Sequence, residues 1–311
     1  MSSTHLVVGA GSVGSALANL LAEDGQEVIV VTRSGSGPNH KNIKRIAANA
    51  SNVSKLLEIA PQAVAIYNCV NPPYHRWAKE WPPLAESFLK FAEKTGAVLV
   101  TCSNLYGYGP VSVAMNESLP LNAPGIKGKV RAQMWLDAKD LNDAGKIKAT
   151  EVRGSDYVCA GEQSRVGSRV LPKILAGKPA QVLGDINQKH TWTYPLDVAR
   201  LMKIVALDSK AWGKAWHVPS NEAKTQKELV SELASTAGVK NPKLSSVPNI
   251  MWNLLALFNP LLKALKETAY QFQRQYILDD SAARKMFNMQ PTDWNQILKE
   301  VVSETKESIK K

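Results

Sequence analysis

A glycine-rich turn between two apolar runs constrains the fold of this chain more than any other feature. Residues 5–34 read HLVVGAGSVGSALANLLAEDGQEVIVVTRS. The runs LVV and VIVV are typical of strands buried on both faces of a parallel sheet. The stretch between them has apolar residues at helical spacing and ends at Gly25, a residue that favours a helix C-terminus. The segment therefore predicts a strand–helix–strand unit.

The same alternation continues along the chain. Further strands are expected at 43–47, 63–70, 97–102 and 147–154, with 214–219 as a candidate last strand. Helices are expected at 53–60, 74–95, 129–145 and 195–207. Six strands alternating with helices predict an α/β fold with a doubly wound parallel sheet. The pattern loosens after residue 160, where we expect a smaller, mainly helical C-terminal lobe that binds the substrate.

Composition narrows the class of protein. A hydrophobic content of 44% and a charged content of 21% are ordinary for a soluble globular protein. The formal net charge of +11 permits an anionic partner, but the basic residues form no long run, so we expect no nucleic-acid partner. Three cysteines without Cys-x-x-Cys spacing predict neither disulfides nor a metal site, and favour the reducing cytoplasm.

One apolar stretch raises the question of a membrane. Residues 250–265 read IMWNLLALFNPLLKAL, which is too short to span a bilayer and is interrupted by polar residues and a proline. We expect a kinked helix packed on the body of the protein, no signal peptide and no membrane partner.

The turn itself, Gly9 to Gly14, satisfies G-x-G-x-x-G in the strand–turn–helix context that dinucleotide sites require. Gly9 allows the tight turn, Gly11 lets the backbone approach a pyrophosphate, and Gly14 lets helix and strand pack closely. The N–H groups of Ser12 and Val13 at the helix start are expected to face the phosphates. We therefore expect a Rossmann-like NAD(P)-binding domain at 1–160, with 190–220 returning to it, and the smaller lobe at 161–189 and 221–311.

The end of the second strand indicates which dinucleotide binds. An NAD site usually has an acidic residue there, but this chain has Thr32, Arg33 and Ser34. Arg33 can bind a 2′-phosphate and Ser34 can donate a hydrogen bond. The sequence predicts NADP, with NAD possible.

Several motifs together resemble the extended and atypical branch of the short-chain dehydrogenase/reductase superfamily, the NAD(P)-dependent epimerase/dehydratase-like proteins. The segments that carry the resemblance are NCVN at 68–71, SNLYGYG at 103–109, VRGSDYVCAG at 152–161 and HTWTYPLDVARLM at 190–202. The resemblance implies cofactor contacts that extend beyond the glycine turn. These implied contacts come from Asn49, Asn68, Cys69, Val70 and Cys102.

The chain departs from this family at its catalytic pair. By resemblance, the Tyr-x-x-x-Lys positions hold Lys127 and Arg131, and Ser103 lies beside the position of the catalytic serine or threonine. Losing a general acid–base group costs roughly 10²–10⁴ in rate. We therefore consider relocated groups, with Lys127 and Tyr106 as the leading catalytic candidates and Tyr108 and Tyr157 as further tyrosines.

Two functions remain open. The first is an NADP-dependent oxidoreductase or epimerase/dehydratase-like enzyme that acts on a small-molecule carbonyl or hydroxyl substrate, as a monomer or homodimer. The second is a non-catalytic NADP-binding sensor or regulator of the same fold. The substrate-binding residues are expected to be aromatic or apolar, and they are Pro72, Tyr74, Tyr106, Tyr157 and Trp192.

Overall fold

The computed structural model describes residues 2–310, without the side chains of residues 249, 253 and 255. The chain divides into two compact units, each built from separate stretches of sequence. Unit 1 comprises Met1–Gly107, Leu121–Gly154 and Pro195–Val218, and unit 2 comprises Tyr108–Pro120, Ser155–Tyr194 and Pro219–Lys311.

Unit 1 is built on a seven-stranded parallel sheet with the strand order β11-β6-β5-β4-β1-β2-β3. The strands are β1 (Thr4–Val8), β2 (Glu27–Thr32), β3 (Ile43–Ala47), β4 (Ala65–Asn68), β5 (Val98–Asn104), β6 (Lys148–Gly154) and β11 (Ala215–His217). The six strands predicted from the apolar runs are all present, and the candidate strand at 214–219 completes the sheet. The doubly wound α/β prediction is therefore confirmed.

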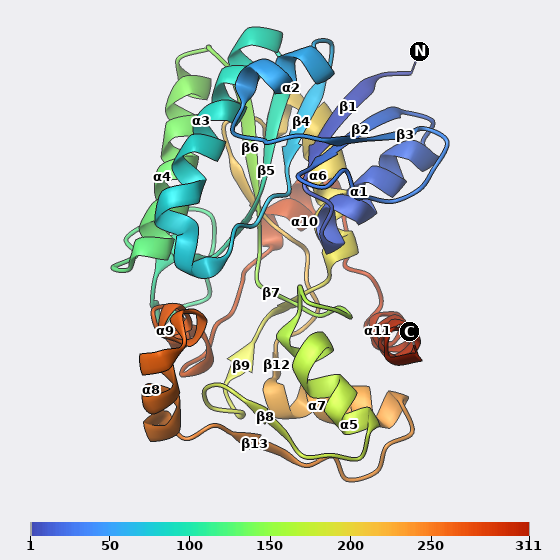
Figure 1. The fold of residues 1–311 in the computed structure, drawn as a ribbon. Helices are drawn as coiled ribbons and strands as arrows, with labels where there is room; N and C mark the ends of the chain where they lie inside the picture. The colour runs from blue at the N-terminus through green and yellow to red at the C-terminus, as the bar shows by residue number, and fades with distance from the viewer. Residues whose placement is uncertain (1, 311) are drawn as a thin grey trace. The chain divides into compact units, whose positions relative to one another are not determined.

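Helices cover both faces of this sheet, as Figure 1 shows. One face carries α1 (Ser12–Glu23) and α6 (Pro195–Leu207), and the other carries α2 (Val53–Ile59), α3 (Trp77–Thr95) and α4 (Ile126–Asp143). Short 3₁₀ turns lie at η1 (Tyr74–Arg76), η2 (Tyr106–Tyr108) and η4 (Ser209–Ala211). The buried strands β1 and β4 are apolar because helices shield them from water on both sides.

The position of β1 decides where a ligand can bind in unit 1. β1 pairs with β2 on one side and with β4 on the other, so the chain winds outward from β1 in both directions. Ligands of open α/β sheets bind beyond the carboxyl ends of the strands at such a reversal. The glycine turn follows β1 directly, and it therefore lies at this point of the sheet.

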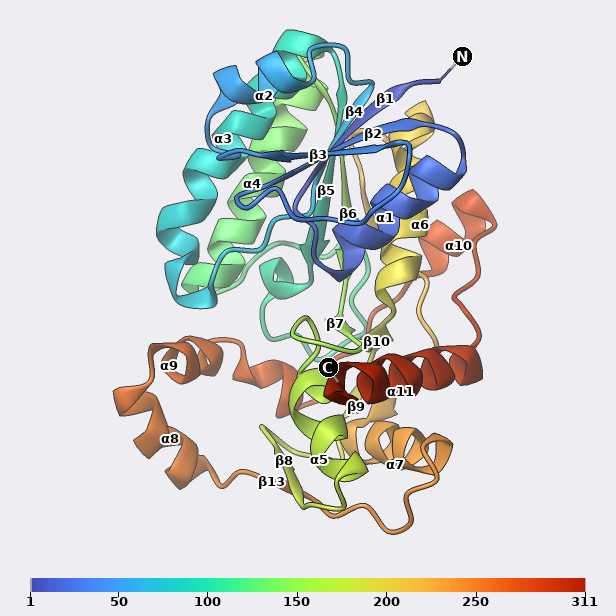
Figure 2. The same cartoon turned by 45° about the vertical axis from the view of Figure 1, so that its right-hand side comes forward.

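Unit 2 is mainly helical, with three two-stranded ribbons (Figure 2). Its helices are η3 (Val166–Val170, a π-helical turn), α5 (Leu171–Leu175), α7 (Gln226–Thr236), α8 (Asn249–Phe258), α9 (Pro260–Lys266), η5 (Ala269–Phe272), α10 (Ser281–Phe287) and α11 (Trp294–Lys310). The ribbons pair β7 (Asp156–Tyr157) with β10 (Trp192–Thr193), β9 (Lys189–His190) with β12 (Lys224–Thr225), and β8 (Ala180–Val182) with β13 (Leu244–Ser246). One apolar core holds η3, α5, α7 and α11 together.

Two features of unit 2 differ from the sequence expectation. The ribbons were not predicted, because strands of two or three residues are too short to show a period-2 pattern. The apolar stretch at 250–265 breaks into two helices at Asn259 and Pro260, as the expected kink implied. However, only some of its apolar side chains are buried against the rest of the protein. Trp252 and Ala256 are buried, whereas five large apolar residues are exposed among the described side chains of α8. Among the residues that the structure describes, no helix has the length and hydropathy needed to cross a membrane.

Candidate active site

The turn after β1 can be built only with glycine at two positions. Gly9 has φ +100°, and a Cβ there would lie 2.5 Å from the carbonyl oxygen of Cys69. A Cβ on Gly14 would lie 2.0 Å from the carbonyl oxygen of Gly9. The start of α1 therefore packs directly against the backbone of the turn. This is the close approach that the motif predicted, and it opens a cradle of backbone groups to a ligand.

Helix α1 begins without a side-chain cap. Gly11 is its N-cap residue, has no side chain to accept from the first helical N–H groups, and is only partly buried. Uncapped N–H groups and the helix dipole favour an anion at this end. The arrangement suits a pyrophosphate.

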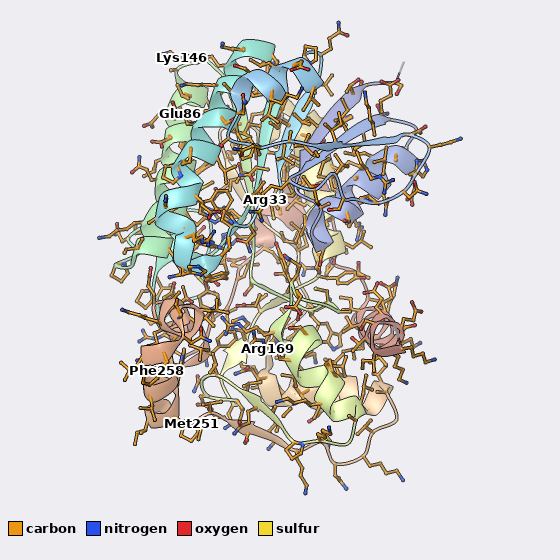
Figure 3. All side chains as sticks on the ribbon, viewed as in Figure 1. Arg33, Glu86, Lys146, Arg169, Met251 and Phe258 are labelled. Carbon is orange, nitrogen blue, oxygen red and sulfur yellow. The ribbon has the colours of Figure 1, made fainter. Side chains whose placement is uncertain are left out.

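The residues after β2 present a positive charge to solvent. Arg33, labelled in Figure 3, is exposed. Its guanidinium has no hydrogen-bond or ion-pair partner in the part of the chain that the structure describes. The Thr32 and Ser34 hydroxyls donate to the carbonyl and the hydroxyl of Ser36, at 2.9 Å each. The loop is thus folded locally, while the Arg33 side chain keeps all its donors for a ligand.

Asn49, for which the resemblance implied a cofactor contact, lies beyond β3. Its side-chain oxygen accepts from the backbone N–H of Ser51 at 3.1 Å and from the Ser51 hydroxyl at 2.9 Å. This turn leads into α2. The Asn49 oxygen therefore already accepts two hydrogen bonds, and the amide nitrogen is the group left to donate to a ligand.

The carboxyl ends of β4 and β5 bring Asn68, Cys69 and Cys102 together. Asn68 pairs with Thr101 in the parallel register, so Cys69 and Cys102 follow at matching positions. Burial raises the pKa of the Cys69 thiol well above its usual value, and the nearby Cys102 raises it further. Asn68 is 1% exposed, and its side-chain nitrogen has no hydrogen-bond partner among the described residues. Cys69 is thus a neutral packing group beside the glycine turn.

Two tyrosine hydroxyls meet in unit 1. The Tyr74 and Tyr106 oxygens lie 2.8 Å apart, although the residues come from the separate turns η1 and η2. The Trp77 ring packs against both tyrosines, with ring centroids 4.8 Å from Tyr74 and 6.1 Å from Tyr106. The Trp77 indole N–H donates to the carbonyl of Pro72 at 2.8 Å, which holds the segment before η1 in place. The structure thus joins three predicted substrate residues, Pro72, Tyr74 and Tyr106, in one cluster.

Arg131 reaches this cluster from α4. Its guanidinium carbon lies 4.5 Å from the centre of the Trp81 ring and 5.2 Å from that of Trp77, at cation–π distance. One nitrogen, Nη2, donates to the carbonyl of Cys102 at 3.4 Å. Arg131 is only 6% exposed, yet its Nε and Nη1 atoms have no hydrogen-bond partner in the described chain. The hydroxyl of Ser103 is similarly buried without a partner.

Buried donors without a partner, such as these, favour this edge of the sheet as the candidate ligand site. A buried donor without an acceptor costs about 1–3 kcal/mol, and more when it is charged. Arg131, Ser103 and Asn68 leave such donors on α4, β5 and β4, three elements around the carboxyl edge of the sheet. A ligand with several oxygen acceptors, such as the hydroxyls and phosphates of a dinucleotide, would satisfy them.

Lys127 is held at the start of α4. The residue is 5% exposed, so its side chain is shielded from solvent. The next residue, Gly128, packs closely: a Cβ there would lie 2.2 Å from the Ala123 Cβ and 2.5 Å from the Tyr106 carbonyl oxygen. This contact fixes the first turn of α4 against the backbone of η2.

Unit 2 holds the remaining predicted residues. Tyr157 and Trp192 lie on paired strands, with Tyr157 opposite Thr193. Trp192 is 4% exposed, belongs to the core of unit 2, and donates its indole N–H to the carbonyl of Lys224 at 2.9 Å. Its ring is therefore a core element, whereas Tyr157 is half-buried.

Sequence reasoning missed two sets of partners. Trp77 and Trp81 are four residues apart on α3, and this helical spacing could have indicated a shared aromatic face for a cation. In unit 2, no local pattern indicates partners for His190, but its Nε2 lies 3.0 Å from a carboxylate oxygen of Asp156 and its Nδ1 lies 3.1 Å from the Gln271 carbonyl. No cluster of three metal-binding side chains occurs among the described residues.

Comparison with known proteins identifies the family. The sequence profile of the NAD dependent epimerase/dehydratase family matches residues 5–218. The chain belongs to this family. The match covers most of the chain, including the glycine turn, the tyrosine pair and Arg131. No curated protein sequence matches the chain.

Solved structures agree with this assignment at the level of the fold. A dTDP-glucose 4,6-dehydratase from Bacillus anthracis, in complex with NAD, has a TM-score of 0.81 at 16% identity, covering 99% of this chain and 98% of that one. A UDP-glucose 4-epimerase from Thermotoga maritima, with UDP-glucose, has a TM-score of 0.81 at 19% identity, covering 98% and 99%. A UDP-glucuronic acid 4-epimerase from Bacillus cereus, in complex with UDP-glucuronic acid and NAD, has a TM-score of 0.77 at 19% identity, covering 98% and 99%. The resemblance expected from the sequence motifs is confirmed.

Proposed function

We propose that this member of the epimerase/dehydratase family binds NADP and is an oxidoreductase or epimerase/dehydratase acting on a hydroxyl or carbonyl group of a small molecule. The observation that carries the proposal is the hydroxyl pair of Tyr74 and Tyr106 at 2.8 Å. It offers a tyrosine for proton transfer in unit 1, where the dinucleotide turn also lies. It would replace the tyrosine that is missing from the start of α4.

The residues present fit a dinucleotide. The backbone cradle at Gly9 and Gly14 leaves no room for a side chain, and the uncapped start of α1 favours phosphate. Arg131 would bind ribose hydroxyls, the role that the lysine of the usual pair has in the family. A guanidinium can donate two parallel hydrogen bonds to vicinal oxygens, so it can serve in place of an ammonium.

NADP is preferred because of the charge after β2. Arg33 is exposed and has no ion-pair partner among residues 2–310 with described side chains, and Thr32 to Ser34 contain no carboxylate that would bind the 2′-hydroxyl of NAD. A hydrogen bond to a charged group contributes ~1.5–3 kcal/mol. Arg33 alone would thus give roughly a ten- to hundredfold preference for a 2′-phosphate.

Tyr106 would hold or release the proton at the substrate oxygen. The nicotinamide ring, when bound, supplies hydride transfer. The Tyr74 hydroxyl can donate to the Tyr106 oxygen, which stabilises that oxygen whenever it carries negative charge. The buried Ser103 hydroxyl can donate to the reacting oxygen of the substrate. Lys127 is the alternative acid–base group, because it is buried one residue from the contact between Gly128 and η2.

Cofactor choice is tested by fluorescence titration of NADPH and NADH. Wild-type protein should bind NADPH roughly ten- to hundredfold more tightly, and Arg33→Ala should lose most of that preference while NADH affinity stays constant. Lys146→Ala is the matched control, because this exposed lysine precedes β6 at the opposite edge of the sheet (Figure 3). Equal affinity of the wild-type protein for the two nucleotides would refute the NADP assignment.

Turnover is tested with single tyrosine variants. Tyr106→Phe should lower kcat by roughly 10²–10⁴ and leave NADPH affinity unchanged, whereas Tyr74→Phe should have a smaller effect. Products must be analysed together with cofactor absorbance, because an epimerase returns its cofactor to the starting state. Lys127→Ala tests whether Lys127, and not Tyr106, is the acid–base group. If Lys127→Ala removes activity and Tyr106→Phe does not, the assignment of Tyr106 is wrong.

A second function is favoured by the start of α4 itself, where Lys127 and Arg131 replace the usual pair. The chain would then be an NADP-binding sensor without turnover. Tight NADPH binding with no product from any alcohol, carbonyl or sugar-nucleotide substrate would support this second function over the first.

A further inference from the structure

Helix α8 displays an apolar face to solvent. Among the residues of α8 whose side chains the structure describes, five are large, apolar and exposed. They are Ile250 (84%), Met251 (47%), Leu254 (60%), Leu257 (76%) and Phe258 (84%). Figure 3 marks Met251 and Phe258, one near each end of the helix. Single exposed apolar residues are ordinary on protein surfaces, but a contiguous group of this kind indicates an interaction site.

The five residues share one side of the helix. At about 100° per residue, they span an arc of roughly 120°. Trp252 and Ala256 lie on the opposite side and are 4% exposed each. The Trp252 indole N–H donates to the carbonyl of Leu262 on α9 at 3.3 Å, so the two helices are joined. The buried side thus anchors α8 within unit 2 and leaves the apolar face of α8 outward.

The sequence around this face carries only positive charge. Between Glu232 and Glu267 there is no aspartate or glutamate, and the only charged residues are four exposed lysines. They are Lys240, Lys243, Lys263 and Lys266. An apolar face flanked by lysines matches a surface that is apolar inside and negatively charged outside, which is the surface of a bilayer that contains acidic lipids.

A second copy of this chain is a poorer occupant. In a twofold symmetric contact the same patch meets itself. Lys263 and Lys266 of α9, the helix that contacts α8, would then meet the same lysines of the second copy, and the 233–266 segment offers no carboxylate to pair with them. A membrane span is also ruled out for this helix, because its ten residues extend about 15 Å, half the hydrocarbon thickness of a bilayer.

We propose that the apolar face of α8 docks this protein on anionic lipid surfaces. The helix would lie in the plane of the interface with its five apolar side chains among the acyl chains. Lys263 and Lys266 on α9 can reach phosphate groups while their methylene stems stay on apolar surface. The sequence predicted no membrane partner because no segment could span a bilayer, and this peripheral contact departs from that prediction. It is independent of the proposed enzymatic function.

The proposal is tested by co-sedimentation of the full chain with vesicles. The protein should sediment with vesicles of phosphatidylcholine and phosphatidylglycerol, and much less with phosphatidylcholine alone. Binding should weaken as salt is raised, because the lysine contribution is screened. The double variant Leu257→Ser/Phe258→Ser should lose vesicle binding. Leu207→Ser is the matched control, since this leucine of α6 is 66% exposed and should leave binding unchanged.

Charge variants test the contribution of the lysines to lipid binding. They also keep the proposal testable if Leu257→Ser/Phe258→Ser fails to fold. Lys263→Gln and Lys266→Gln, both on exposed positions, should each weaken binding roughly fivefold. Circular dichroism and NADPH titration confirm that the variants are folded. Absence of wild-type binding to the anionic vesicles would overturn the proposal. So would a dimer, measured by light scattering, that Phe258→Ser dissociates while vesicles remain unbound, since a second copy would then be the occupant.

Discussion

Gly14→Ala is the change that most directly tests the dinucleotide site. The new Cβ would lie 2.0 Å from the Gly9 carbonyl oxygen, about 1 Å closer than the 3.0 Å minimum distance found for Cβ contacts in proteins. The obstacle is backbone, and the Cys69 Cβ at 3.1 Å blocks the neighbouring space. The start of α1 must therefore shift by about 1 Å. Overpacking of this kind destabilises proteins by typically about 1–3 kcal/mol.

The same shift should weaken cofactor binding beyond its effect on stability. A displacement of about 1 Å takes an N–H···O contact from ~2.9 Å out of hydrogen-bonding range. Each lost bond to a charged phosphate is worth ~1.5–3 kcal/mol, so the NADPH Kd should rise roughly ten- to hundredfold. The assay is NADPH fluorescence titration, with urea unfolding followed by circular dichroism to measure stability.

Gly25→Ala provides the comparison. Gly25 has φ +79°, and a Cβ there would meet nothing within 4 Å. The left-handed backbone should cost about 1–2 kcal/mol of stability. NADPH affinity should not change, because Gly25 lies at the far end of α1. If Gly14→Ala bound NADPH as tightly as Gly25→Ala, the pyrophosphate would not lie at this turn.

Two further predictions concern the stability of unit 1. Burial lowers the pKa of His5 from 6.5 to about 4, so the folded protein holds the neutral imidazole ring. The free energy of unfolding should therefore be highest above pH 6.5, and should fall by up to about 3 kcal/mol as the pH drops to 4. Chemical unfolding at a series of pH values should show this loss in the wild type and a flatter profile in His5→Gln; equal slopes would contradict the assignment. Glu151 and Arg153 form a buried ion pair at 2.6 Å, so Arg153→Ala should destabilise the protein by about 3–5 kcal/mol, and Glu151→Leu/Arg153→Met should recover most of that loss in urea unfolding. Equal losses in the single and double variants would show that the unpaired carboxylate is not the cause.

The fold of unit 1 was predictable because its signals are local and repeated. β3 at Ile43–Ala47 and α6 at Pro195–Leu207 have the bounds that the sequence indicated. Helix α3 forms although Pro82 and Pro83 lie inside it. Its buried aromatic face, with Phe88 and Phe91 in the core, compensates for the backbone hydrogen bonds that prolines cannot make.

Unit 2 was less predictable because its organisation depends on contacts between distant residues. The loop after η2 is tied by Met115, whose backbone bonds with Ile277 and Asp279 at 2.8 and 2.7 Å. No local sequence pattern near Met115 predicts a hydrogen-bond partner more than 160 positions further along the chain. The same holds for His190, whose contacts with Asp156 and Gln271 join three separate segments. Such pairings follow from the folded core and not from periodicity.

The candidate site was predictable in its backbone and not in its side-chain partners. Glycine positions follow from steric limits that any strand–turn–helix motif shares, so Gly9 and Gly14 could be assigned from spacing alone. The hydroxyl contact of Tyr74 with Tyr106 could not, because it depends on how η1 and η2 approach each other. Both tyrosines were singled out as site residues, but neither spacing nor composition indicated that they form a pair.

The replaced catalytic pair is best understood through the surroundings of Arg131. A guanidinium is planar and stacks on aromatic rings, whereas an ammonium is a compact, strongly hydrated charge. Trp77 and Trp81 give Arg131 two ring faces at 5.2 and 4.5 Å, an environment suited to the larger cation. Trp77 also packs against both Tyr74 and Tyr106, so one aromatic cluster supports the cation and the hydroxyl pair together. Arg131 and the hydroxyl pair are therefore supported by the same aromatic residues, as expected if the proposed site uses Tyr106 and Arg131 in place of the usual pair.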